Sequence, residues 1–413
     1  MKLLIIHQYF KELDVTGGAR FNEMARIWHE KGHDITVIAG DLDGQSKKKK
    51  KEYRGNFVTK REQKGITVWR CNVSESYNSN FLGRLWAYFS FVFSGTYAGL
   101  FKIKGKYDLV LVTSPPLFVG IIAYLISVFK RVPFVFEVRD LWPESAIDTG
   151  VLKNKIIIKF AYWFEKFIYK KATLINVLTP AFHEKLIHNK NIPEEKLIMI
   201  PNAADFEMSE KLINDFDSSK FRIDRGWEDK FVITYIGAHG LANGLHQIID
   251  TAILLKDSNV LFVLIGDGMK KEELVSRVQD ENIQNVVFFD PVPKQEALKF
   301  VISSDMGASV LIKNDTFKTI YSNKTFDYMS CKKPILLAID GVSKELVETA
   351  DCGVFVEPEN SNDFVDKINL YRQLNPEELK RLGENGYRYA KDNFDRSVLA
   401  NSYLQNLKKI ADV

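Results

Sequence analysis

The sequence predicts an α/β protein with two doubly wound, Rossmann-like domains. Its 413 residues exceed the length that one hydrophobic core usually supports. Short, nearly continuous apolar runs alternate with helical patterns, and such runs indicate parallel strands that helices cover on both faces. The alternation starts afresh after residue 230, so we expect a second domain of the same class.

Six strands are expected in each domain. In the first they are LLII (3–6), ITVIAG (35–40), DLVLVTSPP (108–116), PFVFEVRD (133–140), TLINVLT (173–179) and KLIMIPNAAD (196–205). In the second they are FVITYIGAHG (231–240), VLFVLIGDG (260–268), VVFFDPV (286–292), MGASVL (306–311), PILLAID (334–340) and GVFVEPEN (353–360). The polar stretch 201–230 is expected to be a linker, and the tail 375–413 is expected to be helical. Because ligands of such folds bind beyond the carboxyl ends of the strands, we expect the site in the cleft between the domains.

Composition limits the class of protein. Cys71, Cys331 and Cys352 are widely spaced and odd in number, which favours neither a disulfide framework nor a zinc site. The opening MKLLIIHQYF is expected to be a first strand and not a signal peptide, and no apolar run is long enough to predict a membrane span.

Charge is distributed unevenly along the chain. Residues 1–200 carry 31 Lys and Arg against 19 Asp and Glu, whereas the remainder carries 26 against 34. The basic half is therefore expected to face something anionic, for which nucleic acid, anionic lipid and a phosphorylated substrate all qualify on charge alone. The Lys47–Lys51 run is expected to be a solvated loop.

Two places in the first half carry candidate site residues. Gly17 and Gly18 directly precede a predicted helix, where backbone amides can approach an anion, although a plain turn explains such a pair about as often. The segment FEVRDLWPESA (136–146) ends a predicted strand with several charged side chains, including Arg139 and Asp140. A carboxylate there can act as a base or hold a hydroxyl, or it can cap the following helix. Asp140 is the stronger candidate because it lies nearest the strand end.

The segment 153–172, KNKIIIKFAYWFEKFIYKKA, interleaves lysines with aromatic and aliphatic side chains. Lys166, Lys170 and Lys171 belong to it. Such a helix suits a membrane interface, and a core helix with a solvated lysine face explains it equally well. The aromatic segment 81–101 and the positive charge of the first half favour the membrane interface.

Two strands of the second half end in glycine turns, IGAHGLANGLHQII (236–249) and IGDGMKKEEL (265–274). A pair of such turns suits the binding of a diphosphate through backbone amides. His239, Lys270 or Lys271 would then supply positive charge.

These segments, with IPNAAD (200–205), FFDPVPKQEAL (288–298) and SNKTFDYMSCKKPILL (322–337), occur in the order seen in glycosyltransferase family four, whose fold is GT-B. The resemblance covers essentially the whole chain. It is most specific in 130–145 and 313–360, where the sequence resembles the bacterial group that includes L-fucosamine transferases of capsule and O-antigen synthesis.

The resemblance implies an enzyme that transfers a sugar with retention of configuration from a nucleotide sugar, usually UDP-linked, to a sugar acceptor, without a cofactor or metal. The donor sugar would be an N-acetylated amino or deoxyhexose such as L-FucNAc. The implied acceptor domain is 1–204, completed by a tail helix 393–413 that crosses back to it, and the implied donor domain is 205–392. The basic, aromatic first half adds the expectation of a lipid-linked saccharide acceptor in capsule, O-antigen or exopolysaccharide synthesis.

By motif match, the resemblance assigns roles to single residues. Asp140 matches the position below the transferred sugar, and Lys324 would supply charge to the diphosphate. In the family, two glutamates eight positions apart bracket the donor, but this chain has Thr319 and Asp327 there. Asp327 can still bind the ribose hydroxyls, whereas the usual contact to the donor sugar has no counterpart at Thr319. The implied donor-binding residues are Gly17, Gly18, Gly237, His239, Gly240, Pro291, Val292, Thr319 and Asp327.

Two other functions are compatible with the sequence: a UDP-sugar 2-epimerase of GT-B fold and a non-catalytic subunit that binds a UDP-sugar. The expected location is cytoplasmic and peripheral on the inner face of the plasma membrane. Arg139, Lys166, Lys170 and Lys171 are the residues expected to contact the anionic membrane surface or the acceptor. Nucleic acid is not an expected partner.

Overall fold

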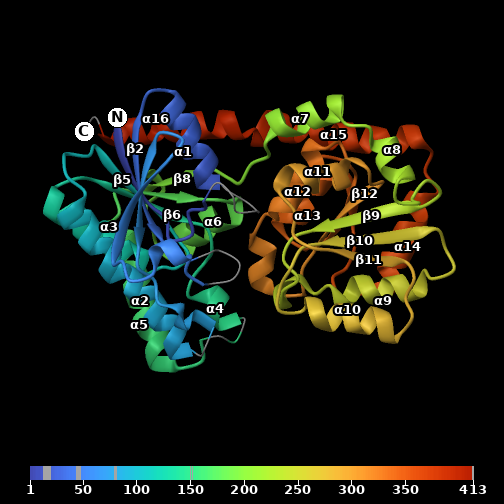
Figure 1. Ribbon diagram of the computed structural model, residues 1–413, viewed down its shortest axis with the longest axis horizontal. Coiled ribbons are helices and arrows are strands. Elements are labelled where there is room, and N and C mark those ends of the chain that lie inside the picture. The colour runs from blue at the N-terminus through green and yellow to red at the C-terminus, as the bar shows by residue number, and fades with distance from the viewer. Residues whose placement is uncertain (13–19, 43–47, 79–80, 149, 151, 412–413) are drawn as a thin grey trace. The chain divides into compact units, whose positions relative to one another are not determined.

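The chain forms two compact α/β units, each built on a mainly parallel sheet (Figure 1). The computed structural model describes residues 1–12, 20–42, 48–78, 81–148, 150 and 152–411. Unit 1 comprises the described residues up to Pro201 and from Ser397 onward, and unit 2 comprises Asn202–Arg396. The expected class, two doubly wound domains, is confirmed.

Unit 1 contains an eight-stranded sheet with the order β3-β4-β2-β1-β5-β6-β7-β8. Its strands are β1 (Lys2–Ile6), β2 (Asp34–Gly40), β3 (Val58–Gln63), β4 (Ile66–Cys71), β5 (Leu109–Thr113), β6 (Phe134–Val138), β7 (Leu174–Val177) and β8 (Leu197–Met199). All six expected strands of the first half are present. The β3–β4 hairpin was not expected, because the edge strand β3 reads VTKREQ and its polar character carries no apolar signal.

Helices cover both faces of this sheet. They are α1 (Arg20–Glu30), α2 (Phe81–Tyr97), α3 (Val119–Lys130), α4 (Glu144–Asp148), α5 (Lys155–Lys171), α6 (Pro180–His188) and α16 (Arg396–Ala411), with the short turns η1 (Lys51–Tyr53), η2 (Glu75–Asn78), η3 (Ala98–Lys102) and η4 (Glu194–Lys196). Figure 1 shows α1 and α16 on one face of the sheet and α2, α3 and α5 on the other.

The last helix of the chain completes the core of the first unit. On α16, Tyr403, Leu404 and Leu407 are buried in one cluster with α1 and the central strands. The indole Nε1 of Trp28 donates a hydrogen bond to the Ala400 carbonyl (2.8 Å). The expected return of the tail helix to the N-terminal domain is thereby confirmed.

Unit 2 contains a six-stranded parallel sheet with the order β11-β10-β9-β12-β13-β14. Its strands are β9 (Phe231–Ile236), β10 (Val260–Ile265), β11 (Val286–Phe289), β12 (Met306–Val310), β13 (Ile335–Ala338) and β14 (Gly353–Phe355). All six lie where the second apolar series predicts strands, and each ends before the last residue of its predicted segment.

The helices of unit 2 also form two layers. They are α7 (Phe206–Asp215), α8 (Ser218–Ile223), α9 (His246–Leu254), α10 (Lys271–Asp280), α11 (Lys294–Ile302), α12 (Asn323–Ser330), α13 (Val342–Thr349), α14 (Ser361–Arg372) and α15 (Pro376–Phe394), with η5 (Leu241–Asn243) and η6 (Asp315–Thr319). One layer holds α9, α10 and α14, and the other holds α7, α11, α12, α13 and α15.

The stretch 201–230 is not a plain linker, so that expectation was wrong. It forms α7 and α8, and Phe206 and Leu212 of α7 are buried in the core of unit 2. Asp205 and Asp217 cap these helices by accepting hydrogen bonds from backbone amides of their first turns. The polar composition of the stretch therefore reflects two capped helices with one apolar face each.

Candidate functional site

Two glycine turns of unit 2 pack backbone against backbone at the carboxyl ends of β9 and β10. Gly237 has φ +141° and Gly266 has φ +147°, a region that favours glycine. A β-carbon on Gly266 would lie 1.8 Å from the Gly237 carbonyl oxygen. The backbone amide of Gly237 donates to the Ile265 carbonyl (2.9 Å), which keeps the two turns in register. At this contact there is no room for a side chain on Gly266.

His239 lies inside this pair of turns and contributes through its backbone. Its amide donates to the Asp267 carbonyl (2.9 Å), and its carbonyl accepts from the Lys270 amide (2.9 Å). The ring is fully buried between Tyr235 and Phe288, and burial lowers its pKa to about 4. An imidazole with this pKa is neutral near pH 7, so the free protein offers no support for positive charge at His239, and that role stays a prediction. Gly240, the next residue, precedes η5.

The two lysines of the second turn already have acidic partners. Lys270 pairs with Glu273, and Lys271 Nζ lies 2.6 Å from the Asp290 carboxylate. Both belong to surface ion pairs. The sequence suggested them as charges for a diphosphate, but the structure directs them to these neighbours.

Lys324 supplies the positive charge next to the Gly237 turn. A β-carbon on Gly237 would lie 3.3 Å from Lys324 Cε and 3.7 Å from Nζ. The ammonium group also lies 4.9 Å from the centre of the Tyr235 ring, a cation–π contact. Burial lowers the pKa of Lys324 to about 8, and Asp327 opposes that shift. An anion bound here would compensate the ammonium group for the hydration that burial removes.

Tyr328 fixes α12, and with it Lys324, against the strand ends. Its buried hydroxyl donates to the Ala308 carbonyl of β12 (2.9 Å) and accepts from the Ile236 amide at the end of β9 (3.2 Å). Ser322 precedes the helix, but its hydroxyl accepts from Ser309 and makes no capping bond to the first turn. The positive end of the α12 dipole is therefore not satisfied by a side-chain cap.

Asp327 and the residues after β11 are connected through one lysine. Asp327 lies one turn beyond Lys324, and its carboxylate is 3.5 Å from Lys294 Nζ. Lys294 begins α11 two residues after Val292, with Pro293 between them as the N-cap. Unit 2 thus links most of the donor residues expected from the sequence: the glycine turns, Lys324, Asp327 and, through Lys294, the turn after β11.

Thr319 lies elsewhere on unit 2, at the end of η6. Its hydroxyl donates to the Thr316 carbonyl of the same turn (2.7 Å). A pocket beside η6 is lined by parts of 312–318, 339–340 and 357–358, where Lys318 Nζ lies 3.6 Å from the Asp340 carboxylate. Asp340 and Glu357 contribute carboxylates to this pocket, whereas Thr319 is not among its lining residues.

In unit 1, Gly17 and Gly18 lie outside the described residues. Asp140 follows β6 and is partly buried. Its carboxylate accepts a hydrogen bond from Ser145 Oγ (2.9 Å), and burial raises its pKa. Glu137, three residues earlier, is completely buried and pairs with Arg20 (3.2 Å), so it belongs to the core of the unit and not to a site.

Arg139 reaches across the strand ends to His7. Arg139 Nη1 lies 3.4 Å from His7 Nε2, and burial beside Arg139 lowers the pKa of His7 well below its usual value. Among the described residues, His7 Nδ1, Gln8 Oε1 and Arg139 Nε have no hydrogen-bond partner. Buried polar atoms without partners at the carboxyl ends of β1 and β6 are candidates for contacts to a ligand.

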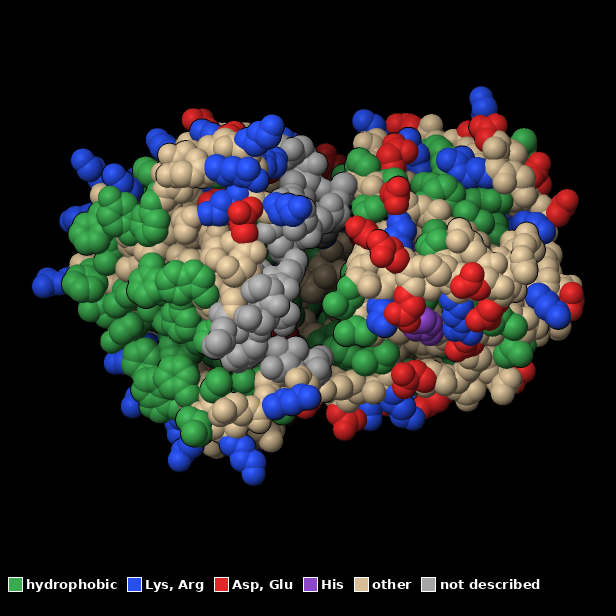
Figure 2. Space-filling view, turned by 60° about the horizontal axis from the view of Figure 1, so that its bottom comes forward, with side chains coloured by type: hydrophobic (Ala, Val, Ile, Leu, Met, Phe, Trp, Pro, Cys, Tyr) green, Lys and Arg blue, Asp and Glu red, His purple; other side chains and the backbone are tan. Residues whose placement is uncertain are grey.

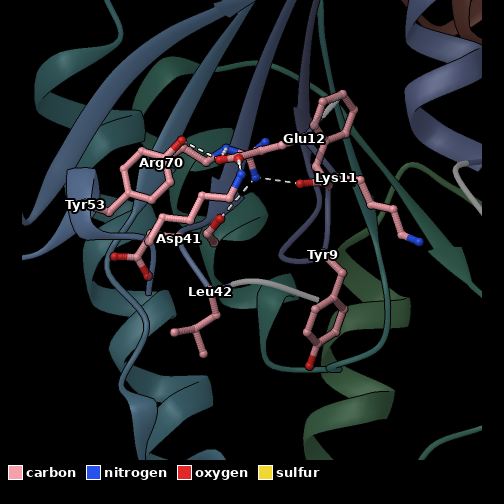
Figure 3. Close-up of a pocket in the computed structure, with 10 residues that line it drawn as sticks. Tyr9, Lys11, Glu12, Asp41, Leu42, Tyr53 and Arg70 are labelled. Atoms are coloured by element: carbon pink, nitrogen blue, oxygen red, sulfur yellow. Dashed lines mark hydrogen bonds and ion pairs between the residues drawn. The ribbon is translucent and has the colours of Figure 1, made fainter. Parts of the chain in front are cut away.

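A pocket at the carboxyl ends of β1, β2 and β4 was not expected from the sequence (Figure 3). In it, Glu12 accepts from the Tyr53 hydroxyl and pairs with Lys50, and its Oε1 lies 3.7 Å from Arg70 Nε. Arg70 Nη1 donates to the Phe10 carbonyl (2.6 Å), whereas Nη2 has no hydrogen-bond partner among the described residues.

Charged side chains from four places in the chain, 11–12, Asp41, Lys50 and Arg70, line this pocket, so no single segment of sequence signals it. Asp41 follows β2 and is buried, and its carboxylate lies 3.3 Å from Lys49. Lys49 and Lys50 thus make ion pairs within unit 1, and the expectation of a plain solvated loop fails for this described part of the lysine run. The only sequence signal for the pocket is the position of Asp41 directly after a strand.

The lysines of the basic helix are exposed. Lys166, Lys170 and Lys171 lie on α5, and Lys171 Nζ is 5.9 Å from the centre of the Tyr124 ring of α3. Arg139 lies apart from them in the sequence, directly after β6. Within the described ranges, no three His, Cys, Asp or Glu side chains are grouped so that they could hold a metal ion.

Two family profiles match most of the chain. Residues 16–203 match the glycosyl transferase 4-like domain, and residues 217–389 match the glycosyl transferases group 1. WcaI of Escherichia coli K12, assigned to colanic acid biosynthesis as a glycosyl transferase, is 23% identical over 89% of this chain and 91% of its own length. A Campylobacter jejuni N-acetylgalactosaminyltransferase, whose name gives an acceptor linked to diphospho-undecaprenol, is 22% identical over 62% of this chain and 64% of its own length.

Solved structures of the same fold cover the whole chain. Anabaena HepE in complex with UDP has a TM-score of 0.71 at 19% identity, covering 99% of this chain and 100% of that one. Sucrose-phosphate synthase from Thermosynechococcus elongatus has the same TM-score at 13% identity, covering 99% and 98%. Two Rossmann-like units of this kind, completed by a helix that returns to the first unit, form the GT-B fold. The chain belongs to the group 1 glycosyl transferases, with a glycosyl transferase 4-like domain before the group 1 domain.

Proposed function

We propose that this glycosyltransferase transfers a sugar, with retention of configuration, from a UDP-sugar to a lipid-linked saccharide during the synthesis of a surface polysaccharide. The observation that carries the proposal is the contact of Lys324 with the Gly237 turn. It joins a cation, a glycine-lined backbone surface and the N-terminus of α12 at one place. An anionic diphosphate is the group that these three features bind best.

The proposed role of the donor site follows from the negative charge that develops on the diphosphate during transfer. When the bond between the sugar and the diphosphate breaks, negative charge accumulates on the phosphate oxygens. Lys324 and the first-turn amides of α12 are positioned to stabilise it. Asp327 would accept hydrogen bonds from the ribose hydroxyls, and backbone atoms of Pro291 and Val292 would contact uracil.

Retention is proposed to follow a front-face route without a metal. The acceptor hydroxyl would attack on the face that the diphosphate leaves, and the leaving phosphate would accept the hydroxyl proton. Asp140 would lie below the transferred sugar, where its raised pKa suits a carboxyl group that hydrogen-bonds to sugar hydroxyls. The sugar itself is proposed to be an N-acetylated amino or deoxyhexose such as L-FucNAc.

The acceptor side is assigned to unit 1. The names of two relatives support a polysaccharide pathway and an acceptor on a polyprenyl diphosphate. The pocket around Glu12 and Arg70 offers carboxylate and guanidinium groups to saccharide hydroxyls. We place the enzyme on the cytoplasmic face of the plasma membrane, where such acceptors are assembled.

A mass-spectrometric screen tests this proposal. UDP-sugars, beginning with UDP-glucose because the related Anabaena protein was crystallised with it, are incubated with undecaprenyl-diphosphate-linked saccharides, and products are identified by mass and anomeric configuration. We expect one donor and acceptor pair to yield a retained glycosidic product. Lys324→Ala and Asp327→Ala should each lose most of that transfer, whereas the exposed controls Lys256→Ala and Asp257→Ala should keep it.

Three outcomes would contradict the proposal. Wild-type rates in purified Lys324→Ala or Asp327→Ala would refute the site assignment. Conversion of a UDP-sugar into its 2-epimer without acceptor would assign the chain to the epimerases. Binding of UDP without turnover across the whole panel would indicate a non-catalytic subunit.

A further inference from the structure

We propose that the outer surface of α2, η3, α3 and α5 is a docking site for an anionic lipid bilayer. The inference rests on the proposed function, because a membrane-bound acceptor requires the enzyme to work at a membrane surface. We call this surface the aromatic face. It consists of Trp86, Phe93, Phe101, Phe129, Phe160 and Trp163, whose exposed fractions run from 50% for Phe160 to 70% for Phe129.

Close helix packing brings these side chains onto one continuous layer. A β-carbon on Gly99 of η3 would lie 2.2 Å from Ile126 of α3, and one on Gly120 of α3 would lie 3.0 Å from Ile168 of α5. The first contact is closer than a real β-carbon comes and the second is tighter than most, so both glycines let the helices approach closely. The aromatic face therefore rests on three helices that are in direct contact.

Buried and half-buried rings pack beneath part of the layer. Phe118, just before α3, stacks on Phe164 of α5 (5.6 Å between ring centres) and contacts Phe89 of α2 (5.0 Å). Further along α5, Phe167 stacks on the exposed Trp163 (5.9 Å) and meets Tyr124 of α3 (5.0 Å). Phe160 and Trp163 of the aromatic face thus belong to one connected set with these rings, and Trp86 and Phe93 form a second pair on α2 (6.5 Å between ring centres).

The charge around the aromatic face is almost entirely positive. The segments 81–106, 117–131 and 152–172 contain twelve Lys and Arg and one acidic residue, Glu165. Glu165 is buried and pairs with Lys190 (2.7 Å), so it presents no charge at the surface. Figure 2 shows hydrophobic side chains gathered over this part of unit 1, with Lys and Arg side chains along its margins. Such a surface complements the headgroups of anionic lipids.

This combination fits a bilayer better than a second copy of the chain. Two copies that met through this face would bring lysine-rich margins together, and like charges would repel one another. A bilayer instead accepts aromatic rings at the headgroup level while the lysines reach the phosphates. Among the described residues, no helix has both the length and the apolar content needed to cross a membrane, so the contact would be with its surface.

The aromatic face also changes which residues are expected to meet the membrane. Lys166, Lys170 and Lys171 lie on its α5 margin. Arg139 does not belong to it, because its guanidinium is partly buried beside His7 at the carboxyl ends of the strands. Unit 2 offers no similar surface, because none of the exposed large hydrophobic side chains of its described residues is aromatic: they are Ile223, Leu241, Leu254, Met269 and Leu370.

Vesicle flotation of the full-length protein tests the proposal. We expect the protein to float with vesicles of equimolar phosphatidylcholine and phosphatidylglycerol, to bind pure phosphatidylcholine weakly, and to dissociate as sodium chloride is raised. The combined variant Phe93→Ser, Phe129→Ser and Trp163→Ser should lower the partition coefficient at least about tenfold. Reversal of charge at Lys166, Lys170 and Lys171 to Glu should have a similar effect.

Two sets of control substitutions in unit 2 test whether vesicle binding depends on the aromatic face. Ile223→Ser, Leu254→Ser and Leu370→Ser remove exposed apolar side chains from unit 2, and Lys211→Glu, Lys220→Glu and Lys256→Glu reverse exposed charges there. Both control sets should bind vesicles like the wild type. Thermal stabilisation by UDP, measured on every variant, reports whether each remains folded and able to bind a donor.

The outcomes separate this inference from the proposed function. Wild-type flotation of both face variants, or no flotation of the wild type, would refute the docking site even if sugar transfer to a soluble acceptor analogue is intact. A wild-type dimer that becomes monomeric in the aromatic variant would assign the face to self-association and also refute it. Flotation that depends on the face in a protein that transfers no sugar would support the docking site and contradict the proposed function alone.

Discussion

At the scale of single residues, Lys324 is the side chain whose chemistry is best matched to a diphosphate. Burial lowers its pKa to about 8, so the free enzyme holds a cation that its surroundings solvate poorly. A bound anion would favour the protonated form and raise this pKa again. The affinity for UDP should therefore depend on pH in the range where Lys324 titrates.

We predict that Lys324→Met weakens UDP binding about 10- to 100-fold at neutral pH, because a hydrogen bond to a charged group is lost. In the wild type, affinity should fall as the pH rises above about 8, where the free lysine loses its proton. Lys324→Arg should keep its charge and show no such fall. Isothermal titration calorimetry from about pH 7 to pH 10 measures both effects, and a pH-independent wild-type affinity would contradict the assigned role.

The same pKa shift has a consequence for stability. A lysine whose pKa is lower in the folded state than in the unfolded state binds fewer protons when folded, so the free energy of unfolding rises with pH between the two pKa values. The difference in stability between wild type and Lys324→Met should change in that window, in favour of the wild type as the pH increases.

A second residue-scale prediction concerns the buried ion pair of Arg20 and Glu137. The guanidinium also donates to the carbonyls of Ile200 (2.7 Å) and Pro201, and Glu137 accepts from Asn176 (2.9 Å). Arg20→Met would leave a buried carboxylate without its cation. We expect the free energy of unfolding to fall by about 3–5 kcal/mol. Arg26→Met removes an exposed pair on the same helix and should cost less than about 1 kcal/mol in the same denaturation measurement.

Some of these residues could be found from the sequence and some could not. Lys324 and Asp327 are local to one helix, so their spacing and motif place them together. His239 is different: Phe288, a distant part of the chain, covers its ring, so only the fold makes it neutral. The pocket around Glu12 and Arg70 likewise joins a loop and two strands that are far apart in the sequence.

At the scale of elements, the glycine turns after β9 and β10 pack directly against each other. We predict that Gly266→Ala destabilises unit 2 by about 2–6 kcal/mol, because a side chain there is both strained and in collision with the Gly237 carbonyl. It should also abolish measurable UDP binding. Gly226→Ala is the matched control: that glycine has φ +65° but open space around it, so only about 1–2 kcal/mol should be lost.

The elements themselves show where sequence patterns succeed. Buried parallel strands produce apolar runs, and all twelve expected strands were found for that reason. The hairpin strands β3 and β4 and the helices α7 and α8 were missed. β3, α7 and α8 are largely polar, and Thr67 and Arg70 interrupt the apolar residues of β4, so none of the four has a continuous apolar run. Capping residues such as Asp205 were a local signal for α7 that apolar runs do not contain.

At the scale of the whole molecule, the chain leaves unit 1 after Pro201 and returns to it at Ser397. The stability of the first unit therefore depends on the last helix of the chain. On α16, Leu407 is completely buried against α1 and the central strands. Replacing it should open the core of unit 1 and leave unit 2 intact.

We predict that Leu407→Ala lowers the stability of unit 1 by about 2–5 kcal/mol, the usual cost of a cavity at a buried leucine. Hydrogen exchange followed by mass spectrometry should show faster exchange in β1, β2 and α1, with β9, β12 and α12 unchanged. Leu370→Ala, at an exposed position of α14, should alter neither set. Equal acceleration of exchange in both units would mean that α16 stabilises the molecule as one cooperative body, and that the two units do not unfold separately.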